Sequence, residues 1–248
     1  MINRKITGIS FAIAFSVVLF MWVVFALDYL LELELYRFGV HPGEWEGLIG
    51  VITSPFLHST TDIGHIINNS LPAFVLTWLM FYHYRKIAFK SYLLIYILAG
   101  LGTWFLGKPS YHIGMSGVIY GLTSFLVFSG FFRKNMRVAA ISLFVVFIYG
   151  SMVWGILPIK VGVSWEGHLS GLFAGIMVAV LFKEKGPQPD KLRYEVEEEL
   201  GIEPELEYWK EGFVPPQPPP VTQDNQPKII IQYNYKPRVK AAPNEEEE

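Results

Sequence analysis

Strongly hydrogen-bonding side chains interrupt three apolar stretches of this sequence, and their types are those of a nucleophilic site. His65 and Asn69 occupy one stretch, Ser116 and Tyr120 a second, and His168 a third. A serine hydroxyl is a poor nucleophile near neutral pH and needs a base close enough to take its proton. His168 is the base that this set offers to Ser116, so the two residue types predict acyl-transfer chemistry.

Each of these residues also has an ordinary structural role when it is taken alone. A serine in a membrane span most often bonds back to a carbonyl of its own helix. A histidine near the end of a span can be a structural hydrogen-bonder, and His65 with Asn69 can tie helices together. The occurrence of all three stretches in one chain favours a site.

The composition indicates a membrane protein and excludes several kinds of site. Of the 248 residues, 52% are hydrophobic and 17% are charged, which is too apolar for an ordinary soluble domain. The net charge of −2 without a basic face argues against nucleic-acid binding. No cysteine is present, and the remaining histidines lack the short spacing of zinc ligands and are predicted to be interfacial: His41, His58, His83 and His112. No metal or cofactor is therefore predicted.

Six apolar runs are long enough to cross about 30 Å of hydrocarbon as helices. They cover residues 9–27, 64–82, 91–107, 115–132, 138–157 and 165–182. The first run also resembles a signal peptide, because Arg4 and Lys5 precede it, but no small-x-small cleavage site follows. The sequence predicts an all-α membrane protein, built as a bundle of six transmembrane helices in the lipid bilayer.

The Lys and Arg content of successive connecting segments alternates between high and low, and this alternation predicts the topology. Lys and Arg residues gather before the first run, between the second and third, between the fourth and fifth, and after the sixth. Because connectors rich in Lys and Arg stay in the cytoplasm, both termini are predicted to be cytoplasmic. The polar stretches of the second, fourth and sixth runs then open to the outer side.

The chain is predicted to have two parts. Residues 1–185 hold all six runs and form the membrane domain. Residues 186–248 are charged and proline-rich, which predicts a largely disordered, flexible cytoplasmic tail. The long first loop, residues 28–63, interleaves leucines with glutamates and later contains Trp45, a pattern that predicts partial insertion into the outer leaflet.

The predicted topology brings the polar groups to a common depth. His65, Ser116 and His168 each lie near the first turn of a run that enters from the outer side. At a rise of 1.5 Å per helical residue, their depths differ by no more than about 5–10 Å. Small residues four apart let two transmembrane backbones approach closely, and they recur in the fourth and sixth runs: Gly117 with Gly121 and Gly171 with Gly175. Such an approach would bring the Ser116 hydroxyl toward the His168 ring.

Three motifs in this order resemble those of the rhomboid intramembrane serine proteases. The G-x-S-G motif is Gly114-Met115-Ser116-Gly117, and the H-x-x-x-N motif runs from His65 to Asn69. The G-H-x-x-G-x-x-x-G motif begins at Gly167-His168 and ends at Gly175. The resemblance covers about residues 9–182 and implies the rhomboid six-helix fold.

Two positions depart from the family pattern. A further histidine usually lies five residues before the second-span histidine, whereas His58 lies seven before His65. Gly43 stands where an arginine commonly follows the first-loop proline. Both departures concern the first loop rather than the pair of residues expected to react.

The resemblance also implies a role for each residue. Ser116 and His168 would form a catalytic dyad rather than a triad, with Tyr120 supporting the histidine ring. The oxyanion would be stabilised by His65, the Asn69 amide and the Ser116 backbone N–H. Gly114 and Gly117 would let the substrate backbone approach, and Gly114 is also predicted to serve helix packing with Gly117, Gly121, Gly171 and Gly175. Glu166 lies two residues from His168, about 200° around the helix, so it is not predicted to orient the histidine.

The implied function is an endopeptidase that cleaves transmembrane segments of other membrane proteins without a cofactor. A second hypothesis is a catalytically silent rhomboid-like protein that binds transmembrane helices for trafficking or quality control. Such relatives typically lack the serine or the histidine, and this chain keeps both. A transporter is disfavoured because the spans carry almost no charge near their middle.

Overall fold

Helices make up nearly all the regular structure of the residues that the structure describes. The computed structural model describes residues 4–133, 136–159, 162–187, 195–196 and 199–201, and within them it contains helices and one isolated bridge but no strand. The chain divides into two units, Met1–Lys191 and Leu192–Glu248, and every helix named below belongs to the first. The predicted tail, residues 186–248, falls almost entirely outside the described residues.

Six helices of 14 or more residues overlap the six predicted runs, and the run at 138–157 continues past its helix into a 3-10 helix. They are α1 (Arg4–Leu31), α3 (Ile63–His83), α4 (Ala88–Leu106), α5 (Ser116–Arg133), α6 (Met136–Tyr149) and α7 (Trp165–Leu181). Three segments are long and apolar enough to cross a membrane by length and composition: Ile6–Leu31, Ala88–Leu106 and Ser116–Arg133. Ala140–Tyr149 and Trp165–Leu181 are shorter apolar helices. The predicted helical fold is therefore confirmed for the described residues.

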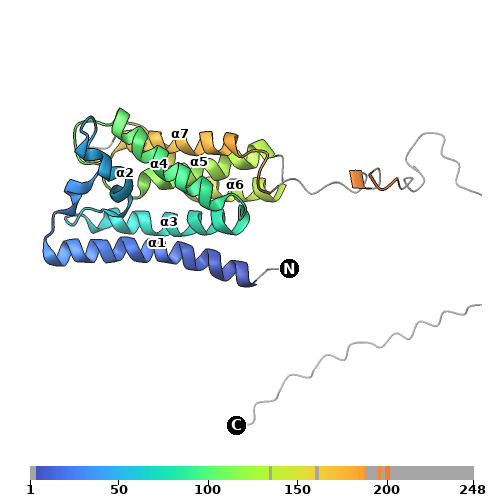
Figure 1. The fold of residues 1–248 in the computed structure, drawn as a ribbon, viewed down its shortest axis with the longest axis horizontal. Helices are drawn as coiled ribbons and strands as arrows, with labels where there is room; N and C mark the ends of the chain where they lie inside the picture. The colour runs from blue at the N-terminus through green and yellow to red at the C-terminus, as the bar shows by residue number, and fades with distance from the viewer. Residues whose placement is uncertain (1–3, 134–135, 160–161, 188–194, 197–198, 202–248) are drawn as a thin grey trace, which may run out of the picture. The chain divides into compact units, whose positions relative to one another are not determined.

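Helix α5 lies at the centre of the first unit. It packs most extensively against α7 and also contacts α3, α4 and α6, while α1 packs against α3 at the edge (Figure 1). Leu122 and Phe125 of α5 are fully buried in the core. Ser116 is the first residue of this central helix, so its position is set by packing on several sides.

The first loop is tied to the segments around the start of α5. It contains three 3-10 helices and one short α-helix: η1 (Leu35–Phe38), η2 (Glu46–Ile49), α2 (Gly50–Thr53) and η3 (Ser54–Phe56). Trp104 Nε1 of α4 donates to the Glu44 carbonyl at 2.8 Å, and the Tyr96 hydroxyl donates to the Ile52 carbonyl. Trp45 is 82% exposed, in agreement with a loop that carries apolar side chains on its surface.

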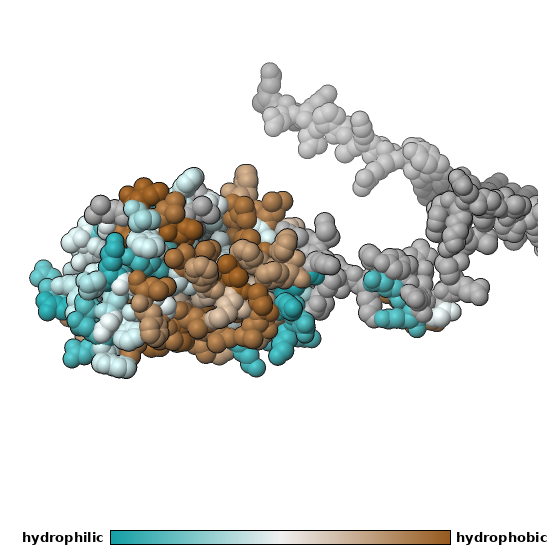
Figure 2. All heavy atoms as spheres, turned by 90° about the horizontal axis from the view of Figure 1, so that it is seen from above, coloured by the Kyte–Doolittle hydropathy of each residue, from teal (hydrophilic) through white to brown (hydrophobic). Residues whose placement is uncertain are grey.

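Exposed apolar side chains cover the middle of the first unit. Figure 2 shows hydrophobic surface between two more hydrophilic ends on the face that it displays. Phe147 of α6 and Phe131 of α5 are 85% and 79% exposed. A contiguous apolar surface of this size is unusual for a protein in water and is typical of one that faces lipid.

Candidate active site

Ser116 and His168 meet where α5 and α7 begin. Ser116 is the first residue of α5, and His168 lies in the first turn of α7. The distance between Ser116 Oγ and His168 Nε2 is 2.9 Å, which is that of a hydrogen bond. His168 is buried, whereas Ser116 is half-buried. The arrangement places a serine hydroxyl beside a base that is largely shielded from solvent.

A backbone carbonyl holds the other nitrogen of the His168 ring. Nδ1 is 2.9 Å from the Gly155 carbonyl oxygen, which can only accept, so Nδ1 carries the proton in the neutral ring. Nε2 is then the acceptor, and the Ser116 hydroxyl donates to it. This tautomer is the one that a general base toward Ser116 requires.

Gly155 was not among the residues expected at the site. It lies in the 3-10 helix η4 (Gly150–Ile156) that continues α6. A Cβ at Gly155 would overlap the Tyr120 hydroxyl and would lie 3.1 Å from His168 Nδ1. In the sequence Gly155 is one glycine near the end of an apolar run, and only its proximity to His168 in the structure identifies it as part of the site.

Tyr120 lies against the face of the His168 ring. The ring centroids are 4.2 Å apart and the planes differ by 11°, which is a stacked arrangement. Tyr120 is one helical turn after Ser116 on α5, so one helix supplies both the hydroxyl and the ring support. The stack and the Gly155 carbonyl together restrict rotation of His168.

His65 approaches the same loop from α3. The Asp62 side chain caps this helix by accepting from Gly64 N at 2.9 Å, three residues before His65. Gly114 has φ +109, a backbone conformation that favours glycine, and a Cβ there would fall 2.5 Å from His65 Nε2. The His65 ring therefore lies directly beside the turn that leads to Ser116.

Asn69 is buried one turn further along α3. Its Nδ2 donates to the His65 carbonyl at 2.8 Å, so one amide hydrogen is used within its own helix. The Asn69 side chain thus steadies the turn that carries His65. The first N–H groups of α5, which include that of Ser116, have no intrahelical acceptor because they begin the helix.

Four of the five predicted packing glycines lie between α5 and α7, whereas Gly114 precedes α5 and lies against His65. A Cβ on Gly171 would overlap the Gly117 carbonyl oxygen, and one on Gly175 would overlap that of Gly121. Reciprocally, a Cβ on Gly121 would lie 3.1 Å from the Gly171 carbonyl oxygen. The two backbones approach closely enough that only glycine fits at Gly171 and Gly175.

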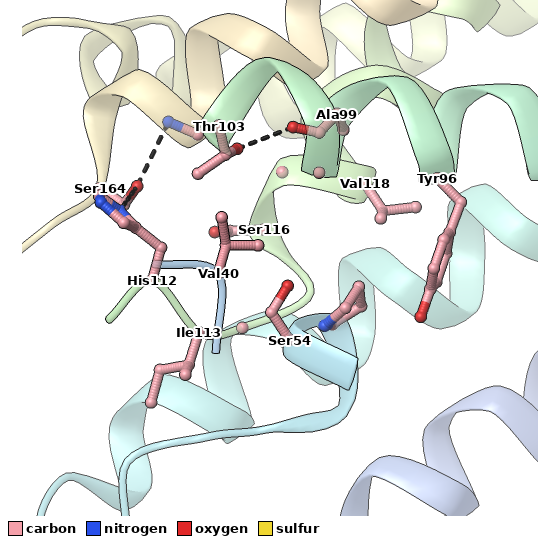
Figure 3. A pocket seen from close by; sticks show the side chains of 15 residues that line it. Val40, Ser54, Tyr96, Ala99, Thr103, His112, Ile113, Ser116, Val118 and Ser164 are labelled. Atoms are coloured by element: carbon pink, nitrogen blue, oxygen red, sulfur yellow. Dashed lines mark hydrogen bonds between the residues drawn. The ribbon is translucent and has the colours of Figure 1, made fainter. Parts of the chain in front are cut away.

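A small cavity of about 30 Å³ adjoins Ser116 (Figure 3). Its lining includes polar groups from the first loop, α4 and the start of α7: Ser54, Thr103, His112 and Ser164. A water molecule needs about 10–15 Å³ by this measure together with polar partners. The cavity therefore offers a polar space of the size of a water molecule next to the serine.

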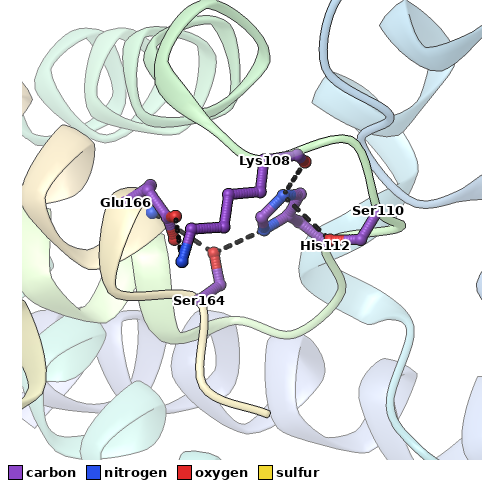
Figure 4. A network of polar contacts seen from close by, with 6 residues as sticks. Lys108, Ser110, His112, Ser164 and Glu166 are labelled. Atoms are coloured by element: carbon purple, nitrogen blue, oxygen red, sulfur yellow. Dashed lines mark hydrogen bonds and ion pairs between the residues drawn. The ribbon is translucent and has the colours of Figure 1, made fainter. Parts of the chain in front are cut away.

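A polar network joins the loop before α5 to the start of α7 (Figure 4). Lys108 Nζ lies 3.7 Å from Glu166 Oε1, and His112 Nδ1 lies 2.6 Å from Ser164 Oγ. Glu166 is buried and pairs with Lys108, whereas His112, expected to be interfacial, is buried and bonded to Ser164. The described residues contain no group of three or more His, Asp or Glu side chains that could hold a metal.

His58 is a buried neighbour of His65 in the loop before α3. It is 2% exposed, and the two imidazole centroids are 5.0 Å apart. Burial, together with the nearby His65 ring, lowers the pKa of His58 from its ordinary value of 6.5 to about 4. His58 is therefore neutral at physiological pH.

Comparisons with known proteins place these residues within one family model. The model described as "Rhomboid domain" matches residues 45–185, which contain every residue predicted for the site. An uncharacterized protein of Mycobacterium tuberculosis (strain ATCC 25618 / H37Rv) is 37% identical over 170 residues, covering 65% of this chain and 70% of the relative. A protein of Acanthamoeba polyphaga mimivirus named as a rhomboid protein is 28% identical over 143 residues, 54% of this chain and 75% of the relative. A protein of Bacillus subtilis (strain 168) named as a rhomboid protease is 27% identical over 157 residues, 60% of this chain and 73% of the relative.

Proposed function

The chain belongs to the rhomboid family of integral membrane proteins, and on this premise we propose that it is an intramembrane serine endopeptidase. Members of this family generally act as serine proteases on transmembrane segments. The observation that carries the proposal for this chain is the 2.9 Å contact between Ser116 Oγ and His168 Nε2. The Gly155 carbonyl supports it by holding the proton on the opposite ring nitrogen.

In the proposed reaction His168 Nε2 first accepts a proton and later returns it. Ser116 Oγ attacks the scissile carbonyl carbon while His168 Nε2 takes the hydroxyl proton. The tetrahedral intermediate then expels the amine, which receives that proton from His168, and an acyl ester remains on Ser116. Water, activated by the same Nε2, hydrolyses the ester and releases the second product. Space for a water molecule beside Ser116 supports this last step.

The oxyanion of the intermediate needs donors fixed in advance. The Ser116 backbone N–H, the His65 ring and the second amide hydrogen of Asn69 are the proposed donors. By analogy with soluble serine proteases, each such donor lowers the barrier by about 3–4 kcal/mol. The position of His65 beside Gly114 supports its share of this role.

The proposed enzyme crosses the membrane six times with both termini in the cytoplasm. Residues 1–185 would form the membrane domain, and residues 186–248 a cytoplasmic tail. The alternating Lys and Arg content of the connectors supports this orientation, with Ser116 near the outer side. Substrates would be transmembrane proteins that unwind locally, because a helical segment hides its scissile carbonyl in hydrogen bonds.

The alternative, a silent protein that binds transmembrane helices, would not need an activated serine. We therefore test for activation with a serine-reactive fluorophosphonate on the detergent-solubilised full-length protein. We expect the wild type to label on Ser116, and Ser116→Ala and His168→Ala to lose labelling while they keep the wild-type unfolding temperature. A folded wild type that fails to label, beside an active rhomboid protease that does, would favour the helix-binding alternative.

A further inference from the structure

The structure contains a second serine–histidine contact, His112–Ser164, beside the contact between Ser116 and His168. His112 Nδ1 is 2.6 Å from Ser164 Oγ, and His168 Nε2 is 2.9 Å from Ser116 Oγ. His112 precedes Ser116 by four residues, and Ser164 precedes His168 by four. Both contacts therefore join the same two segments with the same offset along the sequence.

The His112 ring is held on both sides. Nε2 lies 3.0 Å from the Lys108 carbonyl oxygen and donates to it, so Nδ1 of the neutral ring accepts from the Ser164 hydroxyl. The backbone of His112 is also fixed, because it exchanges two hydrogen bonds of 2.8 and 2.9 Å with Val40 of the first loop. His112 is thus a rigid anchor for whatever bonds to its Nδ1.

Ser164 transmits this anchor to His168. It is the N-cap of α7: its Oγ accepts from Gly167 N at 3.3 Å, and its carbonyl accepts from His168 N at 3.2 Å. A shift of Ser164 therefore displaces the backbone of His168 directly. The Lys108–Glu166 ion pair lies beside this connection, but Lys108 is largely exposed and holds its partner at the longer distance of 3.7 Å.

The α5–α7 pair is held by glycine contacts and by hydrogen bonds further along the two helices. Contacts such as that of Gly171 with the Gly117 carbonyl set how near the two backbones lie. The Ser124 hydroxyl donates to the Leu172 carbonyl at 2.9 Å, and Arg133 donates to the Phe182 carbonyl after α7. At the end that carries Ser116, the His112–Ser164 contact opposes sliding of one segment along the other. A short, directed hydrogen bond resists such sliding because its strength falls steeply with distance and angle.

We propose that His112 and Ser164 are positioning residues that fix the register at which His168 meets Ser116. The inference rests on the proposed function, since it assigns the pair a task in that reaction. Neither residue touches the reacting atoms. Their effect is on the Ser116–His168 geometry, where a misplacement of about 1 Å can slow a reaction about 100-fold.

The test compares variants of the full-length protein that keep or remove the contact. Ser164→Ala removes the hydroxyl, whereas Ser164→Thr keeps it and remains a good N-cap. His112→Asn keeps a polar atom at the position of Nδ1, whereas His112→Gln keeps only the bond toward Lys108. Ser110→Ala is the matched control, because exposed Ser110 reaches the opposite nitrogen, Nε2, only at 3.5 Å.

The readout is the rate constant of fluorophosphonate labelling together with the final fraction labelled. We expect Ser164→Ala and His112→Gln to lower the rate constant about 10- to 100-fold while the labelled fraction stays at the wild-type level. Ser164→Thr, His112→Asn and Ser110→Ala should keep most of the rate. The double variant Ser164→Ala with His112→Gln should be no slower than either single one, because both remove one contact.

A purely structural role would reduce the labelled fraction and leave the rate constant of the remainder unchanged, which would overturn the proposal. So would a Ser164→Ala variant that labels at the wild-type rate, although the proposed protease activity would stand. Peptide mapping that finds the probe on Ser164 would also overturn it. A wild type that never labels would remove the proposed function and this inference together.

Discussion

The two ring nitrogens of His168 have different partners, which is the arrangement that the proposed general base requires. Nδ1 donates to a carbonyl that cannot give a proton back, and Nε2 faces a hydroxyl that can. A histidine whose two nitrogens both donate to carbonyls is the protonated imidazolium, which has no nitrogen left to accept a proton. The Gly155 carbonyl thus fixes the proton on Nδ1, and the Ser116 hydroxyl is the proton donor available to Nε2.

His58 makes the stability of the protein sensitive to acid. Its pKa lies near 4 in the folded protein, below its ordinary value of 6.5, so the unfolded chain takes up the proton first. The contribution is complete above pH 6.5 and is lost as the pH falls toward 4, by about 3 kcal/mol in all. His58→Asn, which keeps a donor toward the Phe56 carbonyl, should lose less stability on acidification.

The measurement for His58 is the thermal unfolding midpoint in detergent at pH 7.5 and pH 4.5. Other groups titrate in the same range, so the informative quantity is the drop for wild type minus the drop for His58→Asn. Equal drops in the two proteins would contradict the assignment of acid sensitivity to this side chain.

At the scale of elements, the 3-10 helix η4 contacts His168, the proposed general base, through its backbone. Gly155→Ala should push η4 away, because the new Cβ would overlap the Tyr120 hydroxyl, and the Gly155 carbonyl would leave His168 Nδ1. We expect the labelling rate of Ser116 to fall at least about 10-fold, as for other losses of positioning. Gly150→Ala is the control in the same element, since its Cβ would meet only Val146 Cγ1 at 3.8 Å.

The two glycine variants of η4 separate local geometry from helix propensity. Each adds one methyl group to the same 3-10 helix. Comparable labelling rates for Gly155→Ala and the wild type would show that the carbonyl contact does not govern reactivity. An equal loss in Gly150→Ala would instead assign the effect to η4 as a whole.

The contact between α5 and α7 should be sensitive to added volume. Gly171→Ala places a methyl group on the Gly117 carbonyl oxygen, and such overpacking typically costs about 1–3 kcal/mol. Gly8→Ala on α1 is the matched control, because nothing lies within 4 Å of its Cβ. The thermal unfolding midpoint should fall for Gly171→Ala and stay or rise for Gly8→Ala, and the same midpoint for both would refute the close contact.

The positions of the helices could be predicted because the length of an apolar run sets the length of the helix. Residues 115–132 were expected and Ser116–Arg133 is observed. The run at 138–157 is divided, however, into α6 and the 3-10 helix η4. An apolar pattern is equally compatible with both helix types, so the turn that carries Gly155 could not be read from it.

The same limit applies to the site. Ser116 and His168 were predictable because their motifs and depth agree, and the structure brings them together. The contacts of Gly155, His112 and Ser164 depend on where two loops pass α7, which residue type does not encode. The one available signal was the equal spacing of 52 residues between His112 and Ser164 and between Ser116 and His168.

At the scale of the whole molecule, the two ends of the first unit are held by different sets of contacts. The end with Ser116 is tied by the first loop and the polar network of Figure 4. At the other end buried Arg133 donates from Nη2 to the Phe182 and Lys185 carbonyls at 2.6 and 2.7 Å. Its guanidinium also lies 5.4 Å from the centroid of the Tyr84 ring. Arg133 thus joins the ends of α5 and α7 to the turn between α3 and α4.

The contacts of Arg133 predict how far the chain can be shortened from its C-terminus. A protein truncated after Lys185 keeps the three carbonyls that accept from Arg133, so its unfolding midpoint and Ser116 labelling rate should match the full chain. A protein truncated after Leu181 loses these three acceptors, and a hydrogen bond to a charged group typically contributes about 1.5–3 kcal/mol. It should unfold at a much lower temperature or fail to accumulate. If the longer truncation product is folded but does not label, residues 186–248 contribute to catalysis. If the shorter one is as stable as the full chain, the contacts of Arg133 do not hold this end together.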